Sequence, residues 1–195
     1  MVIVGLGGLS REIHSYFSDV VTGFTVSSGT NLSELYGLPI YKDFASIPKD
    51  NPVIIAIGDP LLKEKVVEQL GGSILFPNLV FHNAFVGKDV EIGKGVVICP
   101  NCALSANIKV GDFVLINLNS TVGHDCIIGD FVNIAPGSNI SGNCTIGDRV
   151  YVGSNSVIRE KISICSDVTI GMGSVVVKDI VESGTYVGNP CKKIR

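Results

Sequence analysis

A six-residue rhythm of aliphatic residues runs through the second half of the chain. Every sixth position from Val86 to Val176 holds valine, isoleucine or leucine, sixteen times in succession without an exception. Neither a helix, whose period is about 3.6 residues, nor an ordinary strand, whose period is about 2, sustains this spacing. Glycine often follows the aliphatic residue, at positions 87, 93, 111, 123, 129, 147, 153 and 171. The rhythm therefore predicts short strands repeated around tight, crowded turns.

The position two residues before each aliphatic repeats with a longer period of eighteen. Sorted in this way, it forms one column of small residues, a second of aliphatics and cysteines, and a third of valine alone. The small column is Ala84, Cys102, Ser120, Ser138, Ser156 and Ser174, and the valine column is Val96, Val114, Val132, Val150 and Val168. Like residues then stack on like, at the spacing of about 4.8 Å between neighbouring strands. We predict a three-sided parallel solenoid over residues 79–195, with eighteen residues per coil.

The register of this pattern never slips between Val86 and Val176, so no long loop interrupts the coils. A functional site must then be built from coil surfaces, from flanking segments or from a neighbouring subunit. A prism with flat exposed faces commonly associates with copies of itself, and we therefore expect an oligomer.

Residues 1–78 have a different pattern, in which apolar strands alternate with helices. The expected elements are a strand at 2–4, a helix at 11–17 with Ser10 as its N-cap, strands at 24–26 and 53–57, a helix at 61–70 and a strand at 73–76. This alternation predicts a small Rossmann-like parallel sheet, an α/β domain that precedes the solenoid.

The turn Gly5-Leu6-Gly7-Gly8 is expected to direct its backbone amides toward a ligand at the N-terminus of the first helix. Such a turn binds phosphate groups, so we predict a nucleotide diphosphate lined by Gly8, Leu9 and Ser10. A dinucleotide is disfavoured, because its site needs an acidic residue at the end of the second strand, where serines stand. A tight turn without any ligand is the remaining alternative.

Composition excludes several classes of protein. Of the 195 residues 46% are hydrophobic, yet no apolar run approaches the roughly 18 residues of a membrane span. The formal net charge of -3 is not the excess of positive charge that is typical of nucleic-acid-binding proteins. The first eight residues lack the features of a signal peptide, and the six cysteines then indicate reduced thiols. We therefore expect a cytoplasmic protein without nucleic-acid partners or a membrane span.

Among the three histidines, His124 is distinguished by its place in the repeat. The other two lie on the first helix and near the entry to the solenoid, where a surface histidine is the simpler interpretation. Asp125 follows His124, and the positions eighteen residues away on either side hold Ala106 and Gly142. Small neighbours leave a groove beside the imidazole, and an adjacent carboxylate raises its basicity. We predict a general base, with an inert polar corner as the alternative.

The cysteines of the repeat fit a packed core better than a metal or redox site. Cys99 and Cys102 form a C-x-x-C motif, but the repeat places Cys102 at an inward position and no second such motif exists. Cys126 and Cys144 stack on adjacent coils in another inward column, and we interpret them as core thiols. A metal-dependent carbonic anhydrase would need several histidines in the repeats, which contain His124 alone. We therefore expect no metal.

Segments along nearly the whole chain resemble one family. They are Val4-Gly5-Leu6-Gly7-Gly8, Ala56-Ile57-Gly58-Asp59, Phe81-His82-Asn83-Ala84, the stretch from Gly123 to Gly129, and Val187-Gly188-Asn189-Pro190-Cys191-Lys192. In these segments the chain resembles the sugar acetyltransferases of the sialic acid O-acetyltransferase type, which include the N-acetyltransferases of nucleotide-linked 4-amino sugars. The resemblance implies a left-handed parallel β-helix and a homotrimer with active sites between subunits.

The same resemblance implies roles for individual residues. His124 is the expected general base and Asp125 its partner, with acetyl-CoA lying along the coils. Asn133 stands where the family often has a second histidine that helps to place the acetyl group. A solvated terminus is the alternative for the two tail lysines. The residues expected to line acetyl-CoA are Asn133, Gly142, Ser154, Gly171, Gly173, Asn189, Pro190, Lys192 and Lys193, and those expected to line the sugar nucleotide are Gly7, Gly8, Leu9, Ser10, Ser27, Ser28, Ile57, Gly58 and Asp59.

From these features we expect an acetyl-CoA-dependent N-acetyltransferase that acts by direct transfer on a nucleotide-linked 4-amino-4,6-dideoxy sugar. The nucleotide is UDP, dTDP or GDP, held by the front domain. O-acetylation of sialic acid or another glycan sugar is the alternative reaction. A non-catalytic trimeric scaffold or ligand sensor is the alternative from another class.

Overall fold

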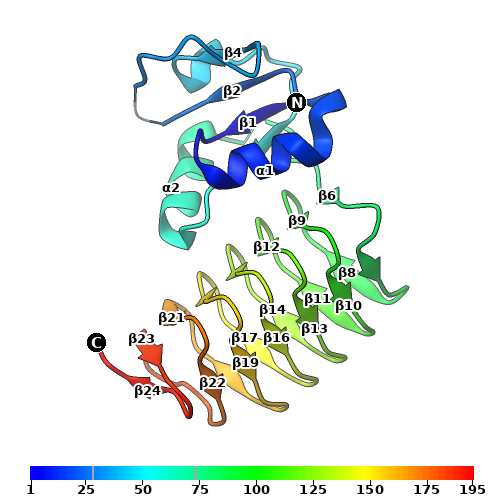
Figure 1. Cartoon of the computed structure of the whole chain (residues 1–195), viewed down its shortest axis with the longest axis vertical. Coiled ribbons are helices and arrows are strands. Elements are labelled where there is room, and N and C mark those ends of the chain that lie inside the picture. Colours follow the sequence, from blue (N-terminus) through cyan, green and yellow to red (C-terminus); the bar gives the residue numbers. More distant parts are fainter. Residues whose placement is uncertain (28, 73) are drawn as a thin grey trace. The chain divides into compact units, whose positions relative to one another are not determined.

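The computed structural model describes residues 1–27, 29–72 and 74–195, and it divides into two compact units (Figure 1). The first unit comprises residues 1–77 and the second residues 78–195. Each unit has its own sheets and its own buried core.

The first unit is built around a five-stranded sheet with the order β3-β4-β2-β1-β5. Strands β4, β2, β1 and β5 run parallel, and β3 pairs with β4 as an antiparallel hairpin. The elements are β1 (Val2–Val4), α1 (Gly8–Phe17), the 3-10 turn η1 (Ser18–Val20), β2 (Gly23–Thr25), β3 (Glu34–Leu35), β4 (Leu38–Tyr41), η2 (Phe44–Ser46), β5 (Val53–Ile55) and α2 (Pro60–Leu70). The predicted Rossmann-like parallel sheet is confirmed.

Two details of the first unit correct the sequence-based expectation. Helix α1 begins at Gly8 with Gly7 as its N-cap, so the prediction of Ser10 as the cap is wrong. The Ser10 hydroxyl lies in the first turn instead and donates to the Gly7 carbonyl at 2.8 Å. No strand forms at 74–76, where the Leu75 carbonyl accepts a hydrogen bond from the Val53 amide, and Ser73 lies outside the described residues.

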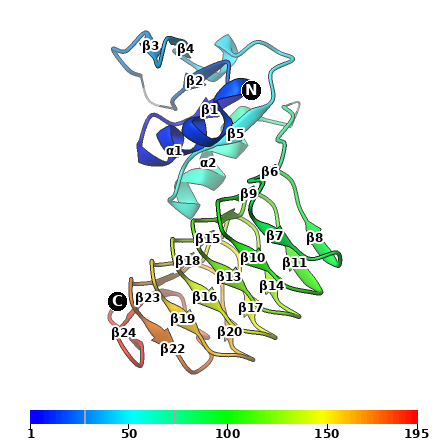
Figure 2. The same cartoon turned by 45° about the vertical axis from the view of Figure 1, so that its right-hand side comes forward.

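The second unit is a left-handed parallel β-helix whose coils stack along one axis (Figure 2). From β6 to β22, each strand pairs in parallel with the strand eighteen residues away, as Ala103 does with Thr121. The first sheet has the order β22-β19-β16-β13-β10-β7, the second β20-β17-β14-β11-β8, and the third β24-β23-β21-β18-β15-β12-β9-β6. The first sheet contains β7 (Phe85–Val86), β10 (Ala103–Leu104), β13 (Thr121–Val122), β16 (Asn139–Ile140), β19 (Val157–Ile158) and β22 (Val175–Val176). The second contains β8 (Val90–Ile92), β11 (Ile108–Val110), β14 (Ile127–Ile128), β17 (Thr145–Ile146) and β20 (Ser163–Ile164). The third contains β6 (Leu79–Val80), β9 (Val97–Ile98), β12 (Leu115–Ile116), β15 (Asn133–Ile134), β18 (Tyr151–Val152), β21 (Val168–Ile170), β23 (Gly184–Val187) and β24 (Lys192–Lys193).

The six-residue rhythm fills the interior of this solenoid. Every sixth residue from Ile98 to Val176 is buried, whereas Val86 and Ile92 in the first coil are half-buried. The column of small residues is explained by hydrogen bonding as well as by the limited space in the interior. The hydroxyls of Ser120, Ser138 and Ser156 donate to backbone carbonyls fifteen residues further on, at 3.0, 2.9 and 3.0 Å. The column therefore satisfies carbonyl groups in the buried core.

The turns that join the first sheet to the second form what we call the first corner. Asn107, Asp125 and Asn143 occupy the same place in its successive coils, at φ values of 53°, 58° and 60°. Asparagine and aspartate tolerate this left-handed conformation better than most residues. Close packing between coils also requires a glycine at position 123, because a Cβ on Gly123 would lie 2.6 Å from the Gly142 nitrogen of the next coil. Side chains at this corner therefore keep a fixed spacing from coil to coil.

The chain ends in a hairpin on the third sheet. Strand β23 continues the sheet in parallel, and β24 returns antiparallel to it. The turn between them contains a cis peptide bond at Asn189–Pro190. Among the described residues, neither helix is long and apolar enough to cross a membrane.

Candidate functional site

His124 lies at the first corner, between β13 and β14, and 61% of its side chain is exposed. Its Nδ1 is 2.7 Å from Oδ2 of Asp125. In an extended strand two adjacent side chains would point to opposite faces. The left-handed backbone of Asp125 turns the two side chains toward each other instead. Two residues adjacent in sequence thus form a histidine–carboxylate pair.

The carboxylate determines which imidazole nitrogen carries the proton. Hydrogen bonds from Asn107 and, next, from His124 lower the pKa of Asp125, so this carboxyl stays ionised. An ionised carboxylate only accepts hydrogen bonds, so Nδ1 of His124 is the donor, and in the neutral imidazole Nε2 is then the acceptor. Nε2 makes no hydrogen bond to any described residue. It is therefore available to take a proton from a molecule that reaches the corner.

Gly142 supports the imidazole from the next coil. A Cβ built on Gly142 would lie 2.7 Å from both Cε1 and Nε2 of His124, so the ring rests directly against this glycine. Gly142 is buried, and its backbone N–H donates to no acceptor within the described part of the chain. The structure thus places the small neighbour, and a backbone amide, beside the imidazole.

The next group of predicted cofactor residues lies at a different corner, where turns join the third sheet to the first. Ser154 follows β18 and Gly173 follows β21, and the Gly173 amide donates to the Ser154 carbonyl at 2.8 Å. Gly171 belongs to the same turn as Gly173, and Asn189 and Pro190 belong to the β23–β24 turn, which lies beside this third corner because the Val175 amide of β22 donates to the Gly188 carbonyl at 3.0 Å. The whole first sheet separates the third corner from His124 within one chain.

Asn133 lies on the remaining side of the prism, in β15 of the third sheet, opposite the first corner. It is 4% exposed, and its Oδ1 has no hydrogen-bond partner among the described residues. A buried acceptor without a partner is uncommon in native proteins. Because Asn133 belongs to the third sheet and His124 to the first corner, one chain does not bring the two side chains to the same side of the solenoid.

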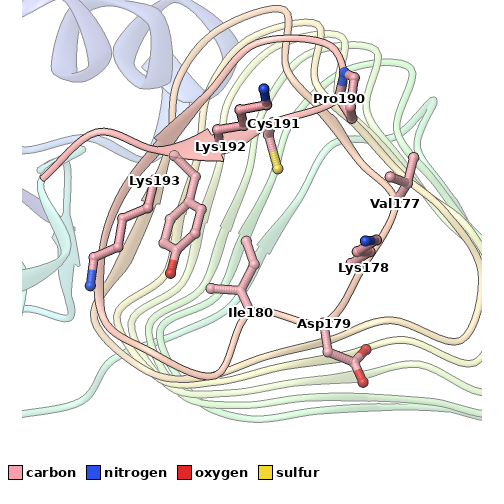
Figure 3. Close-up of a pocket in the computed structure, with 9 residues that line it drawn as sticks. Val177, Lys178, Asp179, Ile180, Pro190, Cys191, Lys192 and Lys193 are labelled. Atoms are coloured by element: carbon pink, nitrogen blue, oxygen red, sulfur yellow. The ribbon is translucent and has the colours of Figure 1, made fainter.

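The two tail lysines border a pocket of about 380 Å³ at the C-terminal end of the solenoid (Figure 3). Inside it, the Ile180 side chain and the Cys191 sulfur point toward one another. The Nζ of Lys193 lies 3.0 Å from Oε2 of Glu182, and this hydrogen bond raises the pKa of Lys193. Lys192 forms no ion pair with the described residues. Of the two lysine ammonium groups, only that of Lys193 is therefore held in an ion pair within the described residues.

The predicted sugar-nucleotide residues gather at one edge of the sheet in the first unit, where β1, β2 and β5 end. Ligands of open parallel sheets bind at this carboxyl edge. No atom lies within 4 Å of a Cβ built on Gly7 or Gly8, so the N-terminus of α1 is open. The Asp59 carboxylate is used within the unit, because it caps α2 by accepting from the Leu62 amide at 2.8 Å. The described residues at this edge are Gly7, Gly8, Leu9, Ser10, Ser27, Ile57, Gly58 and Asp59, and Ser28 lies outside the described residues.

Sequence reasoning missed Asn107. Its Nδ2 donates to Oδ1 of Asp125 at 2.5 Å. The signal that would have found it is the coil period, since Asn107 stands eighteen residues before Asp125.

Two families of hexapeptide repeats match the solenoid. The bacterial transferase hexapeptide (six repeats) matches residues 127–160 and 143–178, and the hexapeptide repeat of succinyl-transferase matches residues 82–112. No curated protein sequence matches the chain.

Solved structures match both units together. WeeI from Acinetobacter baumannii AYE is 34% identical, with 99% of this chain and 98% of that chain covered and a TM-score of 0.85. A variant of perosamine N-acetyltransferase from Caulobacter crescentus, in complex with CoA and GDP-perosamine, is 26% identical over 98% of this chain and 95% of that chain, with a TM-score of 0.91. The acetyltransferase domain of PglB from Neisseria gonorrhoeae FA1090, in complex with acetyl coenzyme A, is 26% identical over 99% and 98%, with a TM-score of 0.89.

These similarities cover the α/β unit as well as the coils. A protein that shared only the hexapeptide repeats would match the coils alone. The chain belongs to the hexapeptide-repeat sugar acetyltransferases that include the nucleotide-amino-sugar N-acetyltransferases, and it is an acetyl-CoA-dependent enzyme of that family.

Proposed function

We propose that the enzyme acetylates the amine of a nucleotide-linked 4-amino-4,6-dideoxy sugar, with His124 as general base. The observation that carries the proposal is the His124–Asp125 pair, which leaves Nε2 open at an exposed corner. Support for an amino-sugar nucleotide comes from the Caulobacter crescentus enzyme, which is named for perosamine and was solved with GDP-perosamine.

The proposed reaction is a direct transfer. The sugar amine attacks the carbonyl carbon of the acetyl thioester, and Nε2 of His124 takes a proton from the amine. The backbone N–H of Gly142 donates to the oxyanion of the tetrahedral intermediate. The carbon–sulfur bond then breaks, the CoA thiolate leaves, and the imidazolium returns the proton to it. A positioned base of this kind contributes about 10²–10⁴-fold to the rate, and no covalent acyl-enzyme forms.

The residues proposed for acetyl transfer lie at two different corners of the solenoid. The proposed base lies at the first corner, whereas Ser154, Gly171, Gly173, Asn189 and Pro190 lie at the third. We propose a homotrimer in which the first corner of one subunit faces the third corner of the next, with acetyl-CoA between them. Asn133 would then contribute through its unpaired carbonyl oxygen from a neighbouring chain, and Lys192 and Lys193 would meet the nucleotide end of CoA.

Subunit mixing tests the shared site. His124→Ala and Ser154→Trp each remove one of the two corners, so each homotrimer should be inactive. After unfolding and refolding of an equal mixture, about a quarter of the sites pair an intact first corner with an intact third corner. Recovery near that fraction supports sites between subunits, and no recovery from well-folded mixed trimers contradicts them.

We further propose that the first unit holds the sugar nucleotide. The open glycine turn at the N-terminus of α1 suits the diphosphate, because unpaired amides and the helix dipole favour an anion there. The remaining edge residues are then available to the base and the sugar.

Release of the CoA thiol tests the function directly. Acetyl-CoA is offered with UDP-, dTDP- and GDP-linked 4-amino-4,6-dideoxy sugars, and with their 4-hydroxy counterparts and sialic acid. Turnover on one amino sugar that falls at least about a hundredfold in His124→Ala supports the proposal. Turnover on hydroxyl acceptors alone supports the O-acetyltransferase instead. A protein that binds neither acetyl-CoA nor any acceptor would be a scaffold, against the proposal.

A further inference from the structure

We propose that Asn107 is a positioning residue for His124, acting through Asp125. It holds one carboxylate oxygen of Asp125 so that the other oxygen faces the imidazole. This inference rests on the proposed function of His124 as general base, and it assigns a third member to that pair.

The geometry consists of two hydrogen bonds on one carboxylate. Nδ2 of Asn107 lies 2.5 Å from Oδ1 of Asp125, and Nδ1 of His124 lies 2.7 Å from Oδ2. Each oxygen thus has its own donor, and the two donors together fix the plane of the carboxylate. Asp125 is 44% exposed, so without Asn107 its side chain would be free to turn toward water. The donor from Asn107 therefore selects the orientation that His124 requires.

The register of the coils makes this contact dependable. Asn107 and Asp125 occupy the same left-handed position of the first corner in adjacent coils, at φ values of 53° and 58°. The Asp125 amide also donates to the Ala106 carbonyl at 3.0 Å, which ties the two turns together. The two side chains consequently leave equivalent backbone positions in the same direction, one strand spacing apart.

A purely structural ladder is the rival explanation, and the same solenoid contains one. At the third corner, Nδ2 of Asn83 donates to Oδ1 of Asn101 at 2.6 Å, and Nδ2 of Asn101 donates to Oδ1 of Asn119 at 3.1 Å. Stacked amides of this kind stabilise turns without any catalytic role. The ladder is therefore the natural control, because it contains the same bond between the same positions of adjacent coils.

The decisive variant is Asn107→Asp. Aspartate occupies the left-handed corner as asparagine does, as Asp125 and Asp167 show, so the fold is retained. The change replaces the donor by a second carboxylate, which repels Asp125. We expect kcat to fall about tenfold or more with the KM for acetyl-CoA unchanged, as expected for a misplaced base. The matched variant Asn101→Asp should leave kcat within about twofold of the wild type.

A double variant separates positioning from stability. If Asn107 acts through Asp125, then Asn107→Asp added to Asp125→Ala should lower kcat no further. Additive losses in that background would overturn the proposal. An equal loss of kcat in Asn101→Asp, or unchanged kcat in Asn107→Asp, would overturn it as well.

The histidine itself gives a readout that needs no sugar acceptor. With ¹⁵N-labelled histidine, the ring shifts of His124 report which nitrogen is protonated, and only three histidines contribute signals. We expect the Nδ1–H form in the wild type and in Asn101→Asp, and a smaller share of it in Asn107→Asp. An unchanged tautomer in Asn107→Asp contradicts the proposal. This result stands even if no acetyl transfer is found, so failure of the proposed function and failure of the Asn107 proposal are told apart.

Discussion

Replacing Gly142 by alanine tests whether His124 works from the position in which the coils hold it. Gly142 does not have a positive φ, so alanine adopts its backbone without strain. The new Cβ would lie 2.7 Å from Cε1 and Nε2 of His124, whereas ordinary contacts begin at 3.4 Å. The imidazole must therefore retreat by about 0.7 Å, the difference between these distances. Because a misplacement of about 1 Å costs about 10²-fold, we expect kcat to fall by about 10–100-fold.

Stability should respond differently from activity. Alanine restricts the unfolded chain relative to glycine, a gain of about 0.4–1 kcal/mol, and the displaced group is the exposed end of a flexible side chain. The assay combines CoA-thiol release with thermal unfolding, and Gly72→Ala is the control because a Cβ there meets no atom within 4 Å. Full kcat in Gly142→Ala would refute the role assigned to ring position. A lower melting temperature would show that the coil, not the ring, absorbs the clash, which also contradicts the reasoning.

Three further outcomes follow from the structure. Lys192→Ala should raise the KM for acetyl-CoA several-fold and Lys193→Ala less, since the Lys193 ammonium already pairs within the tail; initial rates at varied acetyl-CoA compare them. Ile128→Ala, at a side chain 2% exposed, should lower the free energy of unfolding by about 2–5 kcal/mol, and Ile127→Ala, 51% exposed, by less than about 0.5 kcal/mol in urea denaturation. The thiol of Cys126 should resist iodoacetamide in the folded protein, as read by mass spectrometry, because its hydrogen bond with the stacked cysteine and its burial raise its pKa.

The solenoid was predictable because its physical constraint repeats. A parallel solenoid is the fold that turns one aliphatic at every sixth position toward a common interior, and the coil period fixes which residues stack. The β3–β4 hairpin offers no such redundancy. Its strands have two and four residues, too short for a period, and its turn depends on Tyr36 and Gly37 at φ values of 54° and 73°. A tyrosine at positive φ is rare, so the residue type at position 36 does not predict a turn.

The candidate site was predictable in part for the same reason. The repeat indicates that Gly142 stacks beside His124, and the structure has the ring against that glycine. Adjacency in sequence did not indicate whether Asp125 reaches His124, because the answer depends on the left-handed backbone at Asp125. The burial of Lys63, which is 2% exposed and whose pKa burial lowers to about 7 against the opposing charge of Asp59, has no signal in the sequence of α2. Such features depend on packing rather than on pattern.

An unbroken solenoid leaves little freedom for chemistry, and this chain obtains its site from the coil period itself. The interior is filled by aliphatics, cysteines and hydrogen-bonded serines, and most strands of the coils have only two residues, one of which points outward. At the corners, by contrast, a left-handed residue redirects one side chain toward its neighbour, as Asp125 does toward His124. Asn107 above Asp125 and Gly142 below His124 are both eighteen-residue relations. The spacing that buries the core therefore also sets the distances at the histidine, so a one-residue insertion in either neighbouring coil would disrupt the site along with the fold.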